Sequence, residues 1–256
     1  MSFEQMTIAE LARYLELNED LSPGEEERLR ADKRRGAAVL LERYCRRKER
    51  VLSESARLEK MLVRERLLWD RGYNAVAGTD EAGRGPLAGP VVAAAVILDP
   101  ETAPITGLND SKKLSRAARE KIFDQIVINA RCYAIASASC HEIDHYNIHE
   151  ASLLAMSRAL SRLSPEPDYV LVDGFIIKGC PYRQKAIIGG DALSLSIAAA
   201  SVLAKVARDK IMAVMHDKYP SYGFDRNKGY GTFDHREAIA RFGPCPEHRR
   251  SFRLTE

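Results

Sequence analysis

The sequence changes character near residue 70, and this change constrains the fold more than any other single feature. Residues 1–70 are dense in Glu, Arg, Lys and Leu and contain almost no glycine. Their apolar residues recur at helical spacing, which does not fit the alternation of a strand. After residue 72, apolar runs of strand length alternate with helical patterns. We therefore expect an α-helical N-terminal extension over residues 1–70 and a separate domain over residues 71–256.

Local signals place the helices of the extension. Thr7 is followed three residues later by Glu10, which is the pattern of a capping box at a helix start. Ser22 precedes Pro23, and this pair indicates the start of a second helix. A long helical run is expected from there to about residue 70.

A group of basic residues in this run can be interpreted in two ways. These residues are Arg46, Arg47, Lys48 and Arg50. They would suit an arm that touches DNA, but acids are interleaved with them. Such a mixture of charges favours a solvated helix with one buried stripe.

The second part of the chain has the pattern of an α/β fold. We expect strands over residues 75–79, 89–98, 132–139 and 169–172, and helices over residues 115–130, 147–163 and 192–218. Ser115 stands where it can cap the first of these helices. The alternation of strands and helices predicts a mixed central sheet flanked by helices.

Composition narrows the class of protein. With 256 residues, 45% hydrophobic residues and a net charge of +3, the chain can bury a core, and a nucleic-acid partner is permitted but not required. It has no apolar stretch of about 20 residues and no signal-peptide pattern at the N-terminus, so no membrane association is expected. The five cysteines form no C-x-x-C pair, which predicts free thiols in the cytoplasm. We expect a monomer.

Four acidic residues lie where apolar runs meet glycines: Asp80, Glu81, Asp173 and Asp191. Adjacent strand residues point to opposite faces, so Asp80 and Glu81 can face one cleft only if they follow the strand where the chain bends. Asp191 precedes a long helix, whose free backbone donors its carboxylate could cap. Taken singly, each acid is explained as a turn residue, a cap or a solvated loop residue. Together they stand where α/β folds place their sites.

A cluster of these carboxylates would call for metal. Carboxylates repel one another unless a cation neutralises them, and ligands that are all oxygen favour Mg²⁺ or Mn²⁺ over zinc. Two such ions about 3.5–4 Å apart can activate water and stabilise the departing oxygen in phosphodiester cleavage. The acids therefore predict a divalent-metal site that suits phosphodiester chemistry.

The sequence resembles the ribonuclease HII family, which is the type 2 ribonuclease H family. The matching segments, in the family's order, are GTDEAGRGPLAGPVVAAAVIL (78–98), LNDSKKLS (108–115), VDG (172–174), GDALSLSIAAASVLAKVARD (190–209), KGYGT (228–232) and HRRSF (248–252). The resemblance covers essentially all of residues 75–253. The helical extension is similar to that of a bacterial subgroup, although this part is far less specific.

The resemblance implies a fold, an activity and a catalytic set. The fold is RNase H-like, and the activity is hydrolysis of the RNA strand of RNA–DNA hybrids and of single ribonucleotides embedded in duplex DNA. Cleavage lies 5′ to the ribonucleotide and leaves 3′-hydroxyl and 5′-phosphate ends. The family's four catalytic, metal-binding acids fall on Asp80, Glu81, Asp173 and Asp191, which would hold two Mg²⁺ or Mn²⁺ ions during catalysis.

The same resemblance implies the residues that bind substrate. The family's glycine-arginine-glycine loop falls on Gly83, Arg84 and Gly85, and its backbone would approach the ribose 2′-hydroxyl, which distinguishes RNA from DNA. Tyr230 would stack near the sugar at the RNA–DNA junction. Lys112 matches a position that contacts phosphate.

One position departs from the family pattern. The segment before Asp191 usually reads lysine-glycine-aspartate, whereas Gly189 stands here in the place of the lysine. A basic residue near the metal or the phosphate is therefore missing, which bears on affinity or rate. The sister family, ribonuclease HIII, normally lacks an arginine in the glycine loop, so Arg84 argues against it.

Two other motifs are set aside. Residues 141–145 match H-E-x-x-H, but they span an expected connection between a strand and a helix, where a zinc-protease site would need a helix. Residues 83–88 match G-x-G-x-x-A, but a strand rather than a helix is expected to follow, so no dinucleotide site is indicated.

Two alternative functions remain open. One is a nucleic-acid-binding protein in which the acids are structural or the enzyme is inactive. The other is a different two-metal phosphodiesterase, such as ribonuclease HIII, a DNA nuclease or a resolvase of similar fold. The gathering of four acids argues against the first, and the glycine loop with Tyr230 argues against a DNA nuclease or resolvase, because these features matter only where a 2′-hydroxyl is read.

Overall fold

The computed structural model describes residues 3–18, 20–102 and 104–255. Residue contacts divide the chain into two compact units, residues 1–57 and residues 58–256. The helix α3 (Arg35–Trp69) contributes residues 35–57 to the first unit and residues 58–69 to the second. The division at residue 70 that composition suggests stays a prediction.

The first unit is helical, as expected. It contains the short 3₁₀ helix η1 (Phe3–Gln5), α1 (Ile8–Leu17), α2 (Pro23–Ala31) and the first part of α3. The predicted capping box is present, with the backbone N–H of Glu10 donating to Thr7 Oγ1 at 3.2 Å and that of Thr7 donating to Glu10 Oε2 at 2.8 Å. The helices enclose a small apolar cluster centred on Leu11, Leu15, Leu29 and Tyr44.

The expected helix from residue 24 to residue 70 is interrupted between α2 and α3. Asp32 ends α2 and turns its carboxylate onto the next residues, where Oδ1 accepts a 2.9 Å hydrogen bond from the backbone N–H of Arg34. The Arg34 guanidinium donates to the carbonyl oxygens of Phe3 and Met6. A local side-chain bond to the backbone thus competes with the helix.

Three of the four basic residues considered for a DNA-binding arm pair within their own unit. Arg46 lies 2.6 Å from Glu42, and Lys48 lies 2.9 Å from Asp20. Arg47 packs over the ring of Tyr44 and donates to the carbonyl oxygen of Leu15. These contacts fit the reading of the run as a helix laced with charge pairs.

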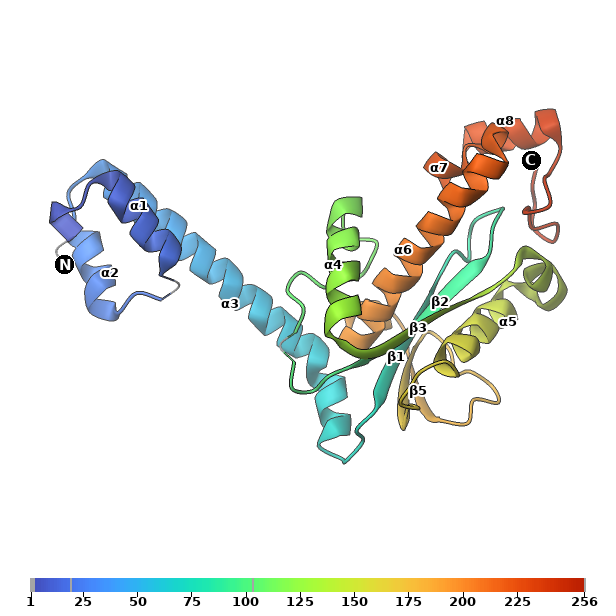
Figure 1. Ribbon diagram of the computed structural model, residues 1–256, viewed down its shortest axis with the longest axis horizontal. Coiled ribbons are helices and arrows are strands. Elements are labelled where there is room, and N and C mark those ends of the chain that lie inside the picture. Colours follow the sequence, from blue (N-terminus) through green and yellow to red (C-terminus); the bar gives the residue numbers. More distant parts are fainter. Residues whose placement is uncertain (1–2, 19, 103, 256) are drawn as a thin grey trace. The chain divides into compact units, whose positions relative to one another are not determined.

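The second unit is built on a five-stranded mixed sheet, which confirms the predicted α/β class (Figure 1). The strands are β1 (Val76–Ala82), β2 (Val91–Leu98), β3 (Ala130–Ala138), β4 (Tyr169–Asp173) and β5 (Arg183–Ile187), in the order β3-β2-β1-β4-β5. The strands β1, β2 and β3 pair antiparallel, whereas β4 is parallel to both β1 and β5.

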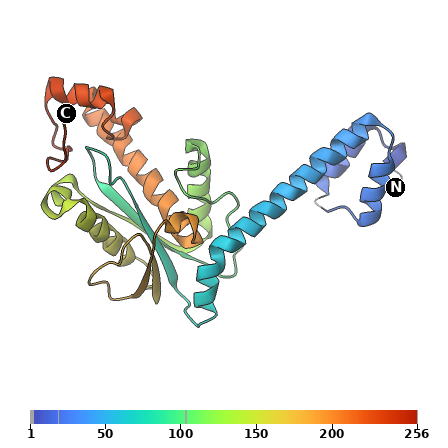
Figure 2. The same cartoon turned by 180° about the vertical axis from the view of Figure 1, so that it is seen from behind.

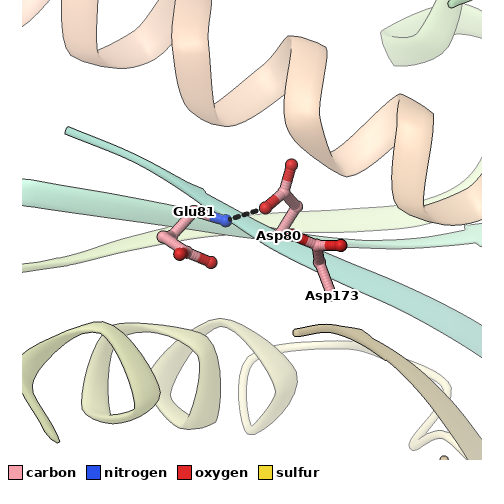
Figure 3. A group of neighbouring side chains, drawn as sticks. All are labelled: Asp80, Glu81 and Asp173. Atoms are coloured by element: carbon pink, nitrogen blue, oxygen red, sulfur yellow. Dashed lines mark hydrogen bonds between the residues drawn. The ribbon is translucent and has the colours of Figure 1, made fainter. Parts of the chain in front are cut away.

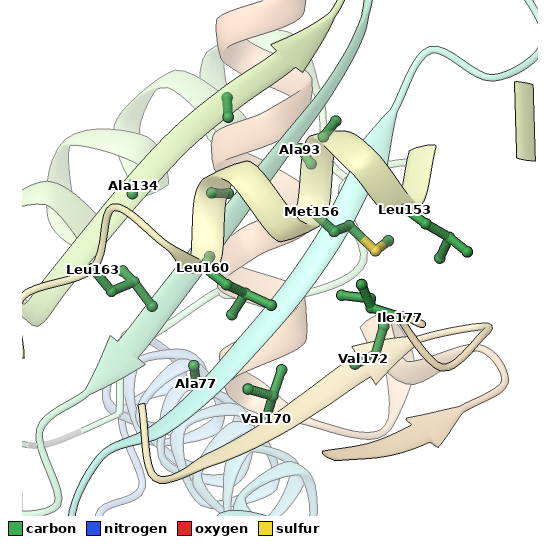
Figure 4. Close-up of a cluster of buried hydrophobic side chains, with 14 of the residues drawn as sticks. Ala77, Ala93, Ala134, Leu153, Met156, Leu160, Leu163, Val170, Val172 and Ile177 are labelled. Atoms are coloured by element: carbon green, nitrogen blue, oxygen red, sulfur yellow. The ribbon is translucent and has the colours of Figure 1, made fainter. Parts of the chain in front are cut away.

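Helices cover both faces of this sheet (Figures 1 and 2). The bounds of the helices are α4 (Arg116–Asn129), α5 (Cys140–Leu160), α6 (Leu195–Lys218), α7 (Phe224–Asn227) and α8 (Phe233–Phe242), with 3₁₀ turns η2 (Gly190–Ala192) and η3 (Pro220–Tyr222). Val91, Ala93, Ala95 and Ile97 of β2 belong to the cluster under α5 (Figure 4), while the intervening Ala94, Val96 and Leu98 belong to the cluster under α4 and α6. Every residue of β2 is therefore buried, which explains its unbroken apolar sequence.

Close packing of α6 on β1 fixes the central layer. A side chain at Gly78 would overlap the backbone of Ser196 and Ile197, so only glycine fits there. The last part of α3 joins the same layer, because Leu58, Met61 and Leu62 are buried in the cluster with α4 and α6.

Several element boundaries differ from those expected. The helix α5 begins at Cys140 rather than near residue 147, because Ser139 and Glu142 form a capping box, and a kink at Asn147 (φ 68°) separates its two segments. The helix α6 begins at Leu195, where Ser194 is the N-cap. Strand β5 and helices α7 and α8 were not expected from the sequence. In β5 only Ile187 is buried, so it lacks the apolar run that identifies a buried strand.

No helix among the described residues is long and apolar enough to cross a membrane. The five cysteines form no disulfide bond with one another in the described structure.

Candidate active site

The site begins where two parallel strands stop pairing. The last paired residues of β1 and β4 are Thr79 and Val172. Asp80 and Asp173 are the next residues on these adjacent strands, so their side chains come close together. This edge matches the setting predicted for Asp173 at the carboxyl end of its strand.

The expectation that Asp80 and Glu81 follow their strand is wrong, because β1 continues through Ala82 and pairs both residues with β2. Their side chains leave opposite sides of β1, as strand geometry requires (Figure 3). They still approach each other, since β4 ends at Asp173 and leaves this edge of β1 uncovered. One carboxylate oxygen each from Asp80, Glu81 and Asp173 lies within 4.8 Å of the other two.

Arg84 pairs with Glu81, but the three carboxylates still repel one another. Burial raises the pKa of Asp80 well above its usual value, and the charges of Glu81 and Asp173 raise it further. Burial also raises the pKa of Glu81, although Arg84 opposes this shift. The Oε2 atom of Glu81 is buried and has no hydrogen-bond partner among the described residues. A divalent cation fits this donor set, because it would neutralise the repulsion and use the unpartnered oxygen.

Asp191 lies beside this cluster rather than within it. It sits in η2, whose position is fixed by a 2.7 Å hydrogen bond from the backbone N–H of Gly190 to Oδ1 of Asp173. Burial raises the pKa of Asp191, with Asp110 adding to the shift and Lys112 opposing it. The alternative that Asp191 caps the long helix is wrong, because Ser194 accepts the capping bond of α6.

The structure brings the predicted substrate-binding residues to these acids. Arg84 Nη1 lies 3.1 Å from Glu81 Oε1, and Lys112 Nζ lies 3.6 Å from Asp191 Oδ2. The Tyr230 side chain is 46% exposed, and its Cε1 atom is 3.7 Å from the point where a Cβ on Gly85 would lie. Tyr230 therefore faces Gly85, the residue next to Arg84.

Gly83 turns the loop between β1 and β2. Its φ of +97° favours glycine, and a side chain there would overlap the buried guanidinium of Arg208. Glycine at this position therefore allows the loop to pack directly against Arg208.

Sequence reasoning missed several residues that surround the site. Asp110 faces Asp191, and the Ser201 hydroxyl hydrogen-bonds Asp80 and lies 2.9 Å from Ser111 Oγ. Both Asp110 and Ser201 fall in segments that carry the family resemblance, but nothing in their local pattern marks them as parts of a site. Four further buried residues lie beneath the loop and Tyr230: Arg208, His235, His248 and Arg249.

The two motifs that were set aside do not form sites. Residues 141–145 are helical, contrary to the expected connection, but Glu142 is engaged as a cap and pairs with Arg158 at 2.6 Å. The carboxylate of Asp144 accepts hydrogen bonds from the backbone of Arg250 and Ser251. Across residues 3–18, 20–102 and 104–255, the only group of three or more potential ligands is that of Asp80, Glu81 and Asp173. Residues 83–88 lead into β2 rather than into a helix.

Comparisons with protein families cover both parts of the chain. Residues 77–255 match the family described as ribonuclease HII, and residues 7–69 match the family described as ribonuclease HII N-terminal domain.

Curated proteins and solved structures give the same result. The chain is 48% identical to a ribonuclease HII of Anaeromyxobacter sp. over 97% of this chain and 79% of that protein. It is also 48% identical to a ribonuclease HII of Desulfitobacterium hafniense over 97% of this chain and 94% of that protein. The crystal structure of the ribonuclease H2 from Pyrococcus horikoshii is similar with a TM-score of 0.60 and 29% identity, over 70% of this chain and 94% of that one.

Proposed function

The chain belongs to the ribonuclease HII family and is a metal-dependent endoribonuclease, and on this basis we propose what it cuts and how. It hydrolyses the RNA strand of RNA–DNA hybrids and single ribonucleotides embedded in duplex DNA. Cleavage falls on the 5′ side of the ribonucleotide and leaves 3′-hydroxyl and 5′-phosphate ends. The protein acts as a monomer in the cytoplasm.

One observation carries this proposal. The acidic cluster lies next to a glycine loop and a half-exposed tyrosine, and Arg84 joins them by its contact with Glu81. Acids alone would serve any two-metal phosphodiesterase. A loop with a glycine on each side of Arg84, and with an aromatic ring facing Gly85, is useful where a sugar must be inspected, because the 2′-hydroxyl is what separates RNA from DNA at one site.

The metal ligands are Asp80, Glu81 and Asp173, with Asp191 completing the site from η2. Two bound Mg²⁺ or Mn²⁺ ions would supply an activated water and stabilise the departing oxygen. The residues themselves have separable tasks. The buried Asp80 is held by Ser201, and Asp173 both offers a ligand oxygen and anchors the turn that carries Asp191.

The substrate-binding residues recognise the ribose and a phosphate. The backbone of Gly83, Arg84 and Gly85 approaches the ribose 2′-hydroxyl, and Tyr230 stacks near the sugar at the junction. Lys112, whose side chain is 82% exposed, contacts a phosphate as a point charge. Residues 71–256 form the catalytic domain in this proposal, and residues 1–70 form an extension that chemistry does not require.

The test is cleavage of an end-labelled DNA duplex that contains one ribonucleotide, with Mg²⁺, Mn²⁺ or EDTA. An all-DNA duplex of the same sequence is the control. A single metal-dependent cut on the 5′ side of the ribonucleotide, with the control intact, supports the proposal. Cleavage of the control would instead favour another two-metal phosphodiesterase, and binding without cleavage would favour an inactive nucleic-acid-binding protein.

A further inference from the structure

We propose that two adjacent C-terminal residues, His248 and Arg249, position both elements that inspect the ribose, namely the loop 83–85 and Tyr230. They act on these elements through hydrogen bonds and do not touch the substrate themselves. The inference rests on the proposed function, since it concerns how that function is made selective for ribonucleotides.

Arg249 holds the loop from below. Its side chain is fully buried, with Nη2 donating to the carbonyl oxygen of Gly83 at 2.6 Å and Nη1 donating to that of Arg84 at 2.9 Å. Its Nε donates to the carbonyl oxygen of Gly89 at 2.9 Å. Gly89 lies near the other end of the connection between β1 and β2. Burial lowers the pKa of Arg249 to about 9, so it is still charged at neutral pH. The rigid guanidinium fork therefore fixes three carbonyls of the connection between β1 and β2 with charge-assisted bonds.

His248 holds Tyr230 through a second histidine. His235 Nδ1 lies 2.8 Å from the carbonyl oxygen of Tyr230, and His235 Nε2 lies 3.0 Å from His248 Nε2. On the far side, His248 Nδ1 lies 3.0 Å from the backbone nitrogen of Cys245. Both imidazole rings are in the interior, since His235 and His248 are at most 1% exposed.

Only one arrangement of hydrogens satisfies the row of hydrogen bonds that runs from Tyr230 through His235 and His248 to Cys245. The Tyr230 carbonyl can only accept, so His235 Nδ1 carries a hydrogen and its Nε2 accepts. His248 Nε2 then donates, and its Nδ1 accepts from the Cys245 N–H. Burial lowers the pKa of both rings, that of His248 to about 4, so both are neutral at neutral pH. The carbonyl of Tyr230 is thereby tied to a single tautomer of each ring.

The backbone of the same segment ties the two elements to each other. The N–H of Arg249 donates to the carbonyl oxygen of Leu87, and the N–H of Leu87 donates to that of Gly229, both at 2.8 Å. His248 also pairs with Ala88 in an isolated β-bridge. The loop, the residue before Tyr230 and the C-terminal segment thus form one hydrogen-bonded unit.

The bonds from Arg249 to Gly83 and Arg84, and the bond from His235 to Tyr230, all end on backbone carbonyl oxygens of the elements that face the ribose. The Tyr230 side chain and Gly85 remain accessible. The hydrogen bonds on the interior side set the distance between them. Recognition of a hydroxyl group depends on placement within about 0.5 Å. A single embedded ribonucleotide offers only one productive register, whereas a continuous RNA strand offers many. Loosening this support should therefore harm cleavage of the single ribonucleotide most.

Two amide substitutions at one position test this idea. In His235→Asn, the amide nitrogen takes the place of Nδ1 and keeps the bond to Tyr230. In His235→Gln, the amide takes the place of Nε2, keeps the contact with His248 and loses the bond to Tyr230. The two variants have similar polarity, and each loses one bond of the buried row. Tyr230→Ala serves as the reference for complete loss of the ring.

The measurements are kcat and KM on a single-ribonucleotide duplex and on a continuous hybrid, together with Tm and Mn²⁺ binding without substrate. His235→Gln is expected to lose about tenfold in kcat/KM on the single ribonucleotide, which corresponds to one buried hydrogen bond. Its loss on the hybrid should be no more than about threefold, and Mn²⁺ binding should be unchanged. His235→Asn keeps the bond to Tyr230 but loses the support of His248, so its loss on the single ribonucleotide should be smaller, at about threefold. Equal losses on both substrates in either variant, or the wild-type substrate ratio in both variants, would overturn the proposal.

Arg249→Lys provides a second, independent variant if the histidine variants do not fold. It keeps the charge but offers no planar fork, so the single-ribonucleotide substrate should again suffer most. A folded Arg249→Lys with the wild-type substrate ratio would also overturn the inference. If the wild-type protein does not cut the single-ribonucleotide duplex, the proposed function fails. If it cuts and the variants keep its substrate ratio, only this inference fails.

Discussion

Oδ1 of Asp173 accepts a 2.7 Å hydrogen bond from the backbone N–H of Gly190. This bond joins the end of β4 to the turn that carries Asp191, so one acid of the site orients the element that holds another. The turn has little freedom, because a Cβ on Gly190 would lie 2.6 Å from Ile197 Cδ1. Asp173 and Asp191 are thus coupled through the backbone as well as through their charges.

Asp80→Asn should abolish cleavage, leave duplex binding intact and raise stability without metal. The raised pKa values of Asp80 and Glu81 mean that their negative charges destabilise the folded protein at neutral pH. In EDTA we expect Tm to rise by about 2–4 °C, which corresponds to roughly 1 kcal/mol of relieved repulsion. Thermal melts with and without Mn²⁺ check this.

Mn²⁺ should stabilise the wild-type protein and have a much smaller effect on Asp80→Asn. Asp99→Asn is a matched control, since Asp99 lies in the loop after β2 and is not part of the acidic cluster. A variant at Asp80 that turned over substrate at the wild-type rate would refute the metal site.

Truncation should distinguish residues 1–57 from residues 58–70. Deleting residues 1–57 is expected to leave a folded, active enzyme. Deleting residues 1–70 removes Leu58, Met61 and Leu62 from the core and should lower Tm by at least about 10 °C, because each such side chain contributes roughly 2–5 kcal/mol. Thermal melts and activity at saturating substrate on both truncations check this, and equal stability of the two would contradict it.

Glu65 accounts for part of that difference. It is fully buried, and its Oε1 accepts hydrogen bonds from the Ser194 hydroxyl and from the N–H and hydroxyl of Ser196 at the start of α6. In the full-length chain, Glu65→Ala should lower the free energy of unfolding by about 2–3 kcal/mol, because it leaves buried donors without an acceptor. Val63→Ala, on the exposed side of the same helix, is the control and should change it by less than about 0.5 kcal/mol.

Acid should destabilise the protein through His248. Its pKa lies at about 4 in the folded protein against 6.5 in the unfolded chain. The unfolded chain therefore takes up the proton first, so the stability contributed above pH 6.5 is lost as the pH falls from 6.5 toward 4. The full effect is about 3 kcal/mol.

The carboxylates of the acidic cluster act in the opposite sense, because their raised pKa values stabilise the folded protein at low pH relative to high pH. The contribution of His248 is isolated by comparing denaturant unfolding of wild type and His248→Gln across this range. The variant should show the weaker dependence on pH between 6.5 and 4. Parallel pH profiles would show that the ring is not buried as a neutral group.

Gly189→Lys tests the departure from the family pattern. Gly189 has a φ of +64°, and nothing lies within 4 Å of a Cβ added there, so a lysine fits with a backbone cost of about 1–2 kcal/mol. We expect tighter substrate binding, seen as a lower KM whose advantage declines with rising salt, because the added charge lies near Asp191 and the phosphates. Gly189→Gln controls for the side chain without its charge. An equal effect of the two variants would rule out an electrostatic role.

The features that depend on local pattern could be predicted from the amino-acid sequence. The capping box of α1, the apolar run of β2, the α/β alternation and the motif segments all consist of residues that are close together in the chain. These were sufficient for the fold class and, through the family resemblance, for the acids, the glycine loop and Tyr230 as candidates.

How these parts meet depends on tertiary packing and could not be predicted from local pattern. Asp80 and Glu81 lie inside a strand, and they can share a site because β4, some ninety residues later in the sequence, ends beside them. Ser194 rather than Asp191 caps α6. The short strand β5 could not be predicted, because it lacks a buried apolar run. Arg249 and His248 reach the loop and Tyr230 through bonds that no periodicity signals. Such contacts depend on which distant segments pack together, and that is decided when the sheet and its helices bury their apolar faces.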